Sequence, residues 1–144
     1  MKKEECIVAL RHWTRDCDVD LVTTEDRFEL RPSEAVGKRR IFIRFESDED
    51  SGVPAIHYAV LVGCITDSRS LPQILARNRN GVMGTEFYFS AEAEGSQINL
   101  YLETKHFDAE LTAEKIEEIL SSWWFDPLFT MTWNFPNGVE NFLW

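Results

Sequence analysis

Residues 86–103 read EFYFSAEAEGSQINLYLE and contain two runs in which apolar and polar residues alternate. The first run, residues 87–93, places Phe or Ala at every second position, and the second, residues 98–102, does the same with Ile and Leu. Gly95-Ser96 lies between them, and a two-residue loop that begins with glycine is typical of a tight primed turn. Alternation with period two gives each strand one apolar face, so the stretch predicts an antiparallel β-hairpin.

Upstream of this hairpin the sequence predicts one helix and several strands. Residues 3–17 form the helix, because apolar residues recur there at helical spacing: Cys6, Ile7, Leu10, Trp13 and Cys17. Residues 19–22 and 28–30 alternate around a polar turn and predict a half-buried hairpin. Residues 41–45 predict the next strand. Residues 56–65 are apolar on both faces and predict a central strand.

A second, short helix is predicted to begin just after Thr66. Asp67, Ser68 or Ser70 is expected to cap its amino end, and Pro72 is tolerated only in its first turn. The pair Asn80-Gly81 is expected to end the helix, because glycine readily supplies the left-handed residue that follows many helices.

A third helix is predicted to begin after Thr112, whose hydroxyl makes it a good N-cap, with Leu111 placed to contact Ile116 as a hydrophobic staple. Its apolar stripe is expected to consist of Ile116, Ile119, Leu120 and Trp123. At Asp126-Pro127 the helix is expected to stop, kink or restart.

Together these elements predict an α+β fold, a single domain over residues 1–144 in the order α-β-β-β-α-β-β-α. The sheet is expected to be largely antiparallel, with the helices packed against it. No run approaches the roughly 18 apolar residues of a membrane span, and no export signal is evident, so a cytoplasmic protein is expected. Cys6, Cys17 and Cys64 contain no C-x-x-C pair and are interpreted as reduced thiols.

Charge is distributed unevenly along the chain. Residues 1–79 carry 13 basic and 14 acidic side chains, a net charge of −1, whereas residues 80–144 carry 2 and 11, a net charge of −9. Such a field repels phosphate, so neither nucleic acid nor an anionic membrane is expected as a partner. A basic or amphipathic protein partner is favoured, with charge that serves only solubility as an equal alternative.

A search for catalytic and metal-binding patterns leads to the prediction of no catalytic residue, no metal ligand and no cofactor. His57 and Cys64 lie on one predicted strand but seven residues apart, so their side chains are expected on opposite faces. His12 and His106 are interpreted as having no local ligand or carboxylate spacing. The acidic run at residues 46–50 fails the EF-hand template and is interpreted as a solvated loop.

Aromatic residues are concentrated at the end of the chain. Eight of the 18 lie in the last 22 positions: Trp123, Trp124, Phe125, Phe129, Trp133, Phe135, Phe142 and Trp144. Trp123 and Trp124 lie about 100° apart on a helix, so a single stripe cannot bury both deeply. The segment therefore either completes the core or forms an interface. The candidate partner-binding or dimer-interface residues are Trp124, Phe125, Phe129 and Trp133.

Several stretches of the second half resemble one family. Leu75-Ala76-Arg77-Asn78, Gly84, the run from Leu100 to Glu103, and Leu111-Thr112-Ala113-Glu114 are similar to the pattern of the bacterial type III secretion chaperones (the Tir-chaperone family) and their sensory-transduction-regulator relatives. This resemblance implies a homodimer that holds a partly unfolded segment of a partner protein, without enzymatic activity. The alternative hypothesis is an acidic immunity or inhibitor protein that blocks a basic site on a folded enzyme.

Overall fold

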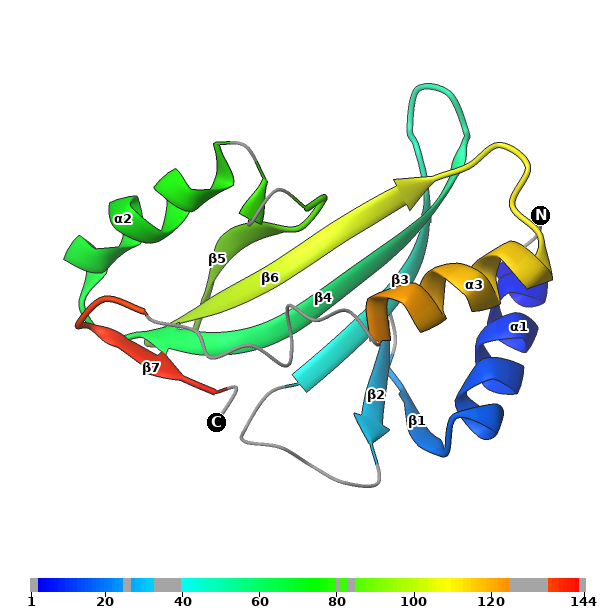
Figure 1. Ribbon diagram of the computed structural model, residues 1–144, viewed down its shortest axis with the longest axis horizontal. Coiled ribbons are helices and arrows are strands. Elements are labelled where there is room, and N and C mark those ends of the chain that lie inside the picture. The colour runs from blue at the N-terminus through cyan, green and yellow to red at the C-terminus, as the bar shows by residue number, and fades with distance from the viewer. Residues whose placement is uncertain are drawn as a thin grey trace. The chain divides into compact units, whose positions relative to one another are not determined.

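The computed structural model describes residues 3–24, 27–32, 40–79, 81–82, 85–124 and 135–142. Within them the chain forms an α+β fold with a seven-stranded, largely antiparallel sheet, as predicted (Figure 1). The helices are α1 (Lys3–Asp16), α2 (Leu71–Leu75) and α3 (Ala113–Trp124), with short 3-10 turns at Ser68–Ser70 and Ala76–Asn78. The strands are β1 (Val19–Thr23), β2 (Phe28–Pro32), β3 (Arg40–Ser47), β4 (Pro54–Ile65), β5 (Tyr88–Glu94), β6 (Gln97–Phe107) and β7 (Val139–Asn141).

The strand order of the sheet is β1-β2-β3-β4-β6-β5, and β7 pairs with β4 outside this path. The chain divides into two compact units. Unit 1 comprises residues 1–34, 42–57 and 105–131, and unit 2 comprises residues 35–41, 58–104 and 132–144. Strands β4 and β6 contribute residues to both units. That residues 1–144 fold as one domain stays a prediction.

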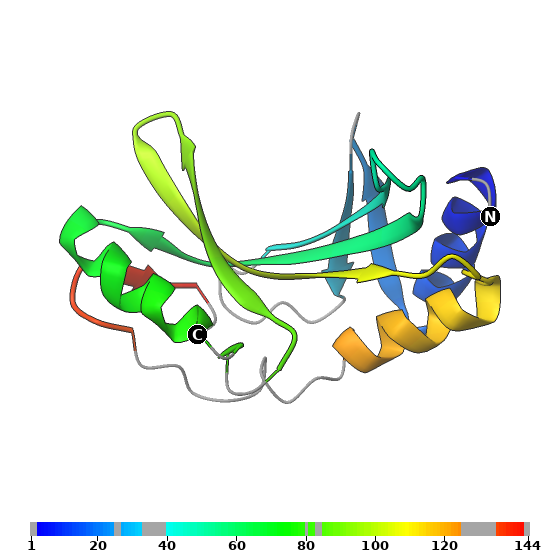
Figure 2. The same ribbon diagram turned by 90° about the horizontal axis from the view of Figure 1, so that it is seen from above.

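In unit 1, α1 and α3 lie side by side (Figures 1 and 2). The buried faces consist of Cys6, Ala9, Leu10, Trp13 and Thr14 on α1 and of Ile116, Leu120 and Trp123 on α3. The stripe predicted for α1 is therefore slightly rotated, because Ala9 is buried whereas Ile7 is half-buried. The predicted cap of α3 is confirmed, since the Thr112 hydroxyl accepts a hydrogen bond from the Lys115 backbone N–H at 3.3 Å.

Four strands, rather than the three of the predicted order, lie between α1 and α2. Strands β1 and β2 form the predicted antiparallel hairpin, which pairs Val19 with Pro32 and Thr23 with Phe28. Each arm of this hairpin counts as one strand, and β3 and β4 follow it, which gives four strands before α2. Residues 58–65 of β4 are all buried, as expected for a strand that is apolar on both faces.

In unit 2 the β5–β6 hairpin has the predicted register, with Glu94 opposite Gln97 and Gly95 in the loop at φ +62°. Its apolar face is buried only at the end away from the loop, because Phe89 is buried but Ala91 and Ala93 are exposed. The Asp67 carboxylate caps the 3-10 turn Ser68–Ser70 that leads into α2, by accepting the backbone N–H of Arg69 at 3.0 Å. Ser70 is the N-cap of α2 itself and makes no side-chain cap hydrogen bond.

Strand β7 was not predicted. It pairs antiparallel with the end of β4, and two glycines make this close approach possible. A Cβ on Gly63 would lie 2.5 Å from the Glu140 carbonyl oxygen, and a Cβ on Gly138 would lie 2.7 Å from the Asp67 Cβ. Gly138 also has φ +96°, and its carbonyl accepts the backbone N–H groups of Thr66 and Asp67. Among the described helices, none is long and apolar enough to cross a membrane.

Replacing Gly63 with Ala is expected to weaken the β4–β7 pairing, because the new methyl group overlaps the Glu140 carbonyl. The expected loss of unfolding free energy is about 1–3 kcal/mol, measured by urea unfolding. Hydrogen exchange locates the effect. The Phe142 N–H, which donates to the Val62 carbonyl at 2.8 Å, should lose protection, whereas amides of the β5–β6 hairpin should keep theirs. Unchanged protection of Phe142 would contradict this explanation of β7.

Candidate protein-binding site

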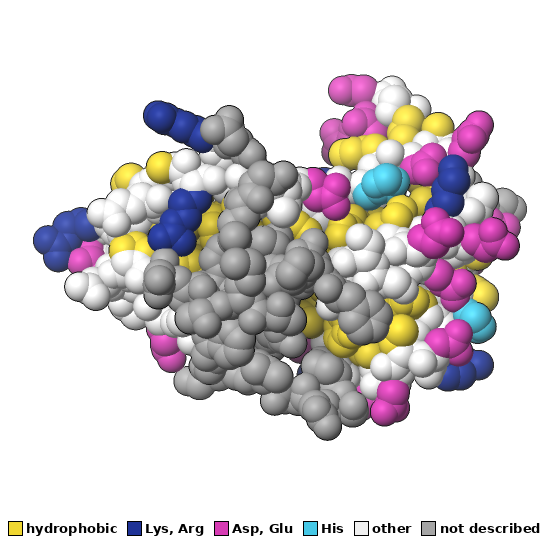
Figure 3. All heavy atoms as spheres, viewed as in Figure 1, with side chains coloured by type: hydrophobic (Ala, Val, Ile, Leu, Met, Phe, Trp, Pro, Cys, Tyr) yellow, Lys and Arg dark blue, Asp and Glu magenta, His cyan; other side chains and the backbone are white. Residues whose placement is uncertain are grey.

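A groove with a volume of about 630 Å³ lies between α1 and the start of α3. Its lining residues are Glu4, Glu5, Val8, Ala9 and His12 from α1 and Ala113 and Glu117 from α3. Val8 is 67% exposed, so its aliphatic side chain lies open to solvent on the α1 wall of the groove. Acidic side chains gather on the part of the surface that α1 and α3 form (Figure 3). The groove therefore combines an apolar floor with an acidic rim.

Trp13 fixes the position of α1 against α3. Its indole Nε1–H donates a hydrogen bond to the Ser121 hydroxyl at 2.9 Å. Its ring also packs edge-to-face on Trp124, with the ring centroids 5.6 Å apart. Trp13 is 3% exposed, so its apolar surface is buried inside unit 1, and its polar N–H has a hydrogen-bond partner there. These contacts hold the two walls of the groove together.

His12 connects the same two helices at the rim of the groove. Its Nδ1 is hydrogen-bonded to the Glu117 carboxylate, and its Nε2 lies 3.7 Å from the Asp16 carboxylate one turn along α1. The hydrogen bond to Glu117, and then the negative charge of Asp16, raise the pKa of His12 above its ordinary value. The rim thus contains an imidazole flanked by two carboxylates from different helices.

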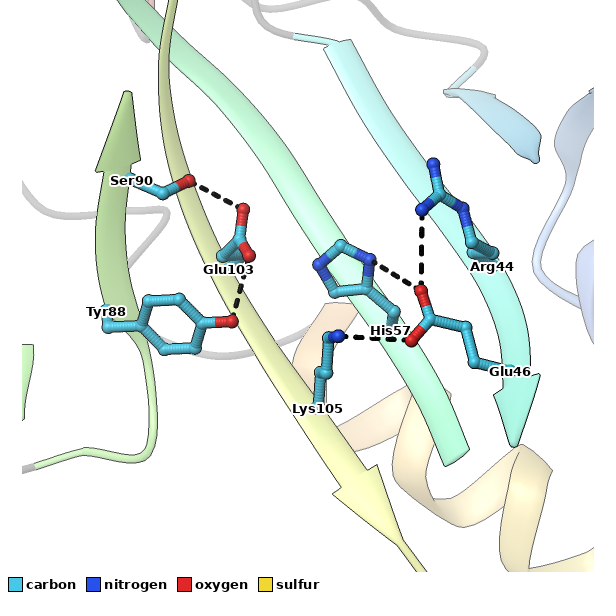
Figure 4. A network of polar contacts seen from close by, with 7 residues as sticks. All are labelled: Arg44, Glu46, His57, Tyr88, Ser90, Glu103 and Lys105. Atoms are coloured by element: carbon cyan, nitrogen blue, oxygen red, sulfur yellow. Dashed lines mark hydrogen bonds and ion pairs between the residues drawn. The ribbon is translucent and has the colours of Figure 1, made fainter. Parts of the chain in front are cut away.

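A second polar cluster in unit 1 surrounds Glu46 on the sheet (Figure 4). The Glu46 carboxylate lies 3.1 Å from Lys105 Nζ, 3.4 Å from Arg44 Nη1 and 3.7 Å from His57 Nδ1. Burial acts to raise the pKa of Glu46, but the hydrogen bond from Lys105 and the neighbouring positive charges outweigh it, so the pKa is lowered. Glu46 is therefore ionised at neutral pH and links strands β3, β4 and β6.

This position corrects part of the interpretation of residues 46–50 as a solvated loop. Glu46 belongs to β3, and its side chain is 24% exposed. Asp48, by contrast, does organise the turn between β3 and β4, because its carboxylate accepts the backbone N–H groups of Asp50 and Ser51 at 2.8 and 2.9 Å. Sequence reasoning could not separate the two acids, since only the fold places cations around Glu46.

In unit 2 a carboxylate joins the two strands of the β5–β6 hairpin. Glu103 accepts hydrogen bonds from the Tyr88 hydroxyl at 2.8 Å and from the Ser90 hydroxyl at 2.7 Å (Figure 4). Both donors lie on β5, the strand that pairs with β6. The arrangement is a cross-strand hydrogen-bond link and strengthens the hairpin.

The outer edge of β5 is a second surface that can accept a partner chain. Asn78 covers this edge at one point, because its side-chain amide donates to the Phe89 carbonyl at 2.8 Å and accepts the Phe89 N–H at 2.6 Å. Outward-facing backbone groups recur at every second residue of an edge strand, so those of Ala91 and Ala93 face the same side. Asn78 therefore blocks the edge at Phe89, whereas the side chains of Ala91 and Ala93 nearer the loop are exposed.

Of the predicted interface residues, Trp124 is half-buried against Trp13, whereas Phe125, Phe129 and Trp133 lie outside the described residues. Trp123 is 2% exposed, as the helical stripe predicted. Phe135 packs on Phe89 within unit 2, with the ring centroids 6.0 Å apart. The described part of the aromatic C-terminal segment therefore packs largely within its own unit.

Sequence reasoning missed the groove and the cluster around His12. One local signal existed, because His12 and Asp16 have the i, i+4 spacing that places both side chains on one helix face. The third member, Glu117, is 105 residues from His12 and is brought near only by the packing of α3 on α1.

Comparison of the chain with protein-family models, with curated proteins and with solved structures gave no match.

Truncation of the two adjacent tryptophans is expected to have unequal effects. Trp123→Ala removes a fully buried aromatic side chain and should cost about 3–5 kcal/mol of unfolding free energy. Trp124→Ala removes a half-buried ring and its contact with Trp13, and should cost about 1–2 kcal/mol. Urea unfolding of both variants measures the difference. Equal losses would show that α3 presents a different face to the core.

The Glu46 cluster is expected to make stability depend on pH in the acid range. Because the folded-state pKa of Glu46 is lowered, its contribution is present above the unfolded-state pKa of about 4.3 and is lost as the pH falls through the lowered value. Glu46→Gln should therefore cost about 1 kcal/mol at neutral pH, and this cost should shrink progressively as the pH falls below the unfolded-state pKa.

Urea midpoints measured across this pH range test the prediction. The matched control, Glu118→Gln, removes the same charge from an exposed position of α3 and should change stability by less than about 0.5 kcal/mol. A loss in Glu46→Gln that does not vary with pH would show that shape, rather than charge, makes this residue important.

Proposed function

We propose that the chain is a non-enzymatic protein-binding module that holds an amphipathic, basic helical segment of a partner protein in the groove between α1 and α3. The observation that carries this proposal is the exposed Val8 beside Ala9 and Ala113, inside a rim that contains Glu4, Glu5 and Glu117. This type of segment agrees with the expectation drawn from the secretion-chaperone resemblance.

The two parts of the groove match the two faces of such a segment. Apolar residues at i, i+3, i+4 and i+7 of the partner helix would pack on Val8 and the two alanines. Lysine or arginine residues on its flanks would meet the rim carboxylates, and the net charge of −10 would speed its approach. Apolar contact would provide most of the binding free energy, and charge complementarity would determine which partner binds.

Cys6 and Glu46 of unit 1 also favour binding over catalysis. Cys6 is buried, and this burial raises the pKa of its thiol, so the reactive thiolate is disfavoured at neutral pH. Glu46 is held in its ionised form by Lys105 and its other neighbours, which makes it a poor proton donor.

An acidic inhibitor remains the second candidate, and a different surface favours it. Glu114, Glu117 and Glu118 surround a shallow hollow on α3 together with Ser121 and Ser122. This surface has no aliphatic floor, so it suits a basic site on a folded enzyme rather than an amphipathic helix. Helix binding in the groove therefore requires a contribution from Val8 to affinity, whereas binding of a folded enzyme to this surface does not.

Peptide binding to matched variants tests the groove directly. A basic amphipathic helical peptide should bind the wild-type chain more tightly than a scrambled peptide of identical composition, as measured by fluorescence anisotropy. Val8→Gln leaves the charge unchanged and should weaken binding by about tenfold, because it removes an aliphatic contact. Glu5→Gln should weaken binding more than Glu118→Gln, although both remove one charge.

Three outcomes would contradict the helix-in-groove proposal. Equal binding of the scrambled peptide would show that charge alone is responsible. Loss of binding in Ala93→Pro, rather than in Val8→Gln, would indicate strand addition at the β5 edge. For a natural partner identified by mass spectrometry, a folded enzyme whose binding depends on Glu118 but not on Val8 would support the inhibitor.

The chain is further expected to be a homodimer, as the resemblance implies. The groove is a poor place for the dimer contact, because pairing two copies there would bring the acidic rims together. Light scattering should give twice the monomer mass of 16.8 kDa at micromolar concentration. A mass near 16.8 kDa that does not change with concentration would rule out the dimer and leave the groove proposal intact.

A further inference from the structure

His12, Asp16 and Glu117 form a cluster of metal-ligating side chains at the rim of the groove. Each of the three residues offers one nitrogen or oxygen atom, and these atoms all lie within 4.8 Å of one another. The His12 and Asp16 side chains are 60% and 64% exposed, and that of Glu117 is 31% exposed. The cluster is therefore open to ions from solution.

We propose that these three side chains bind a divalent transition-metal ion, with Zn²⁺ the best fit, and that the ion joins α1 to α3. Imidazole nitrogen and carboxylate oxygen are both zinc ligands, with bonds of about 2.0–2.2 Å. Three protein ligands leave a coordination position for water or for another donor atom. Ca²⁺ and Mg²⁺ are disfavoured, because both prefer oxygen ligands only.

Binding requires the ligand atoms to move closer together. They now lie within 4.8 Å of one another, and the two carboxylates face different nitrogens of the imidazole, Asp16 facing Nε2 and Glu117 facing Nδ1. A tetrahedral site with these bond lengths holds its ligand atoms about 3.3 Å apart. His12 Nε2 and the Asp16 carboxylate already lie 3.7 Å apart, on adjacent turns of one helix face. Binding would displace the proton shared between His12 and Glu117, because a metal ligand must be deprotonated.

The other described histidines lack this arrangement. His106 lies 3.8 Å from Asp108, but the ammonium of Lys115 lies 3.4 Å from the same carboxylate and supplies its positive charge. His57 shares Glu46 with Lys105. Within the part of the chain that the structure describes, no Lys or Arg forms an ion pair with Asp16 or Glu117. Among the described residues, the group that faces both carboxylates is the imidazole of His12, and a bound cation would contact the same three side chains.

The site does not depend on the proposed function, because its predicted effect is on the packing of α1 against α3. A bound ion should stabilise the folded chain in proportion to its occupancy. Thermal unfolding of the full chain, stripped of metal with a chelator, is therefore measured against increasing Zn²⁺. We expect the melting temperature to rise with Zn²⁺ and calorimetry to give one ion per chain, whereas Mg²⁺ and Ca²⁺ have no such effect.

Matched variants identify the ligands. His12→Gln, Asp16→Asn and Glu117→Gln should each weaken Zn²⁺ binding by at least about tenfold, since each removes one of three ligands. His106→Gln and Glu118→Gln are the controls and should bind Zn²⁺ as the wild type does. Cys17→Ser should also retain binding, which separates this site from zinc held by the thiol next to Asp16.

The absorption spectrum of bound Co²⁺ gives a second measurement that does not depend on stability. It should show d–d bands of a nitrogen- and oxygen-liganded ion without a thiolate charge-transfer band. The proposal is overturned if about 1 mM Zn²⁺ leaves the melting temperature unchanged, or if His12→Gln and Glu117→Gln bind as the wild type does. Loss of binding in Cys17→Ser would also overturn it.

Discussion

The packing of Trp13 between α1 and α3 is the interaction on which the candidate site depends. Ser121 and Trp124 are more than 100 residues away in the sequence, yet both contact its indole ring. Aromatic contact and a satisfied N–H make this a specific anchor rather than general apolar burial. Because it fixes the two helices side by side, it also creates the groove and brings His12 to Glu117. A change at Trp13 would therefore alter shape, charge and stability together.

Acidic residues have two different roles in this protein. Glu46 is ionised among Lys105, Arg44 and His57, so its charge is used within the sheet. The carboxylates of Glu4 and Glu5 instead line an apolar groove on the surface. Charge that is neutralised within the sheet contributes to stability, whereas charge at the rim of a groove shapes the surface potential there. The composition of the chain alone could not distinguish these roles.

Local patterns predicted the elements that local chemistry determines. The alternation around Gly95-Ser96 gave the correct hairpin, and the helical spacing gave the correct burial of Trp123. Strand β7 escaped prediction because it is short and its place is set by Gly63, on a distant strand. Periodicity indicates which side of a helix is apolar, but it cannot show that Val8 remains uncovered once the helices have packed. Contacts between residues about 100 positions apart depend on the tertiary structure, so no local sequence motif predicts them.

We propose that the groove formed by α1 and α3 holds a basic amphipathic helix. Chemical-shift mapping of the ¹⁵N-labelled chain, titrated with such a peptide, locates the contact residue by residue. We expect the largest changes at the backbone amides of Val8, Ala9 and Ala113, with smaller changes along the rest of both helices. Largest changes at Ala91 and Ala93 on β5, or small changes spread over all acidic residues, would contradict it.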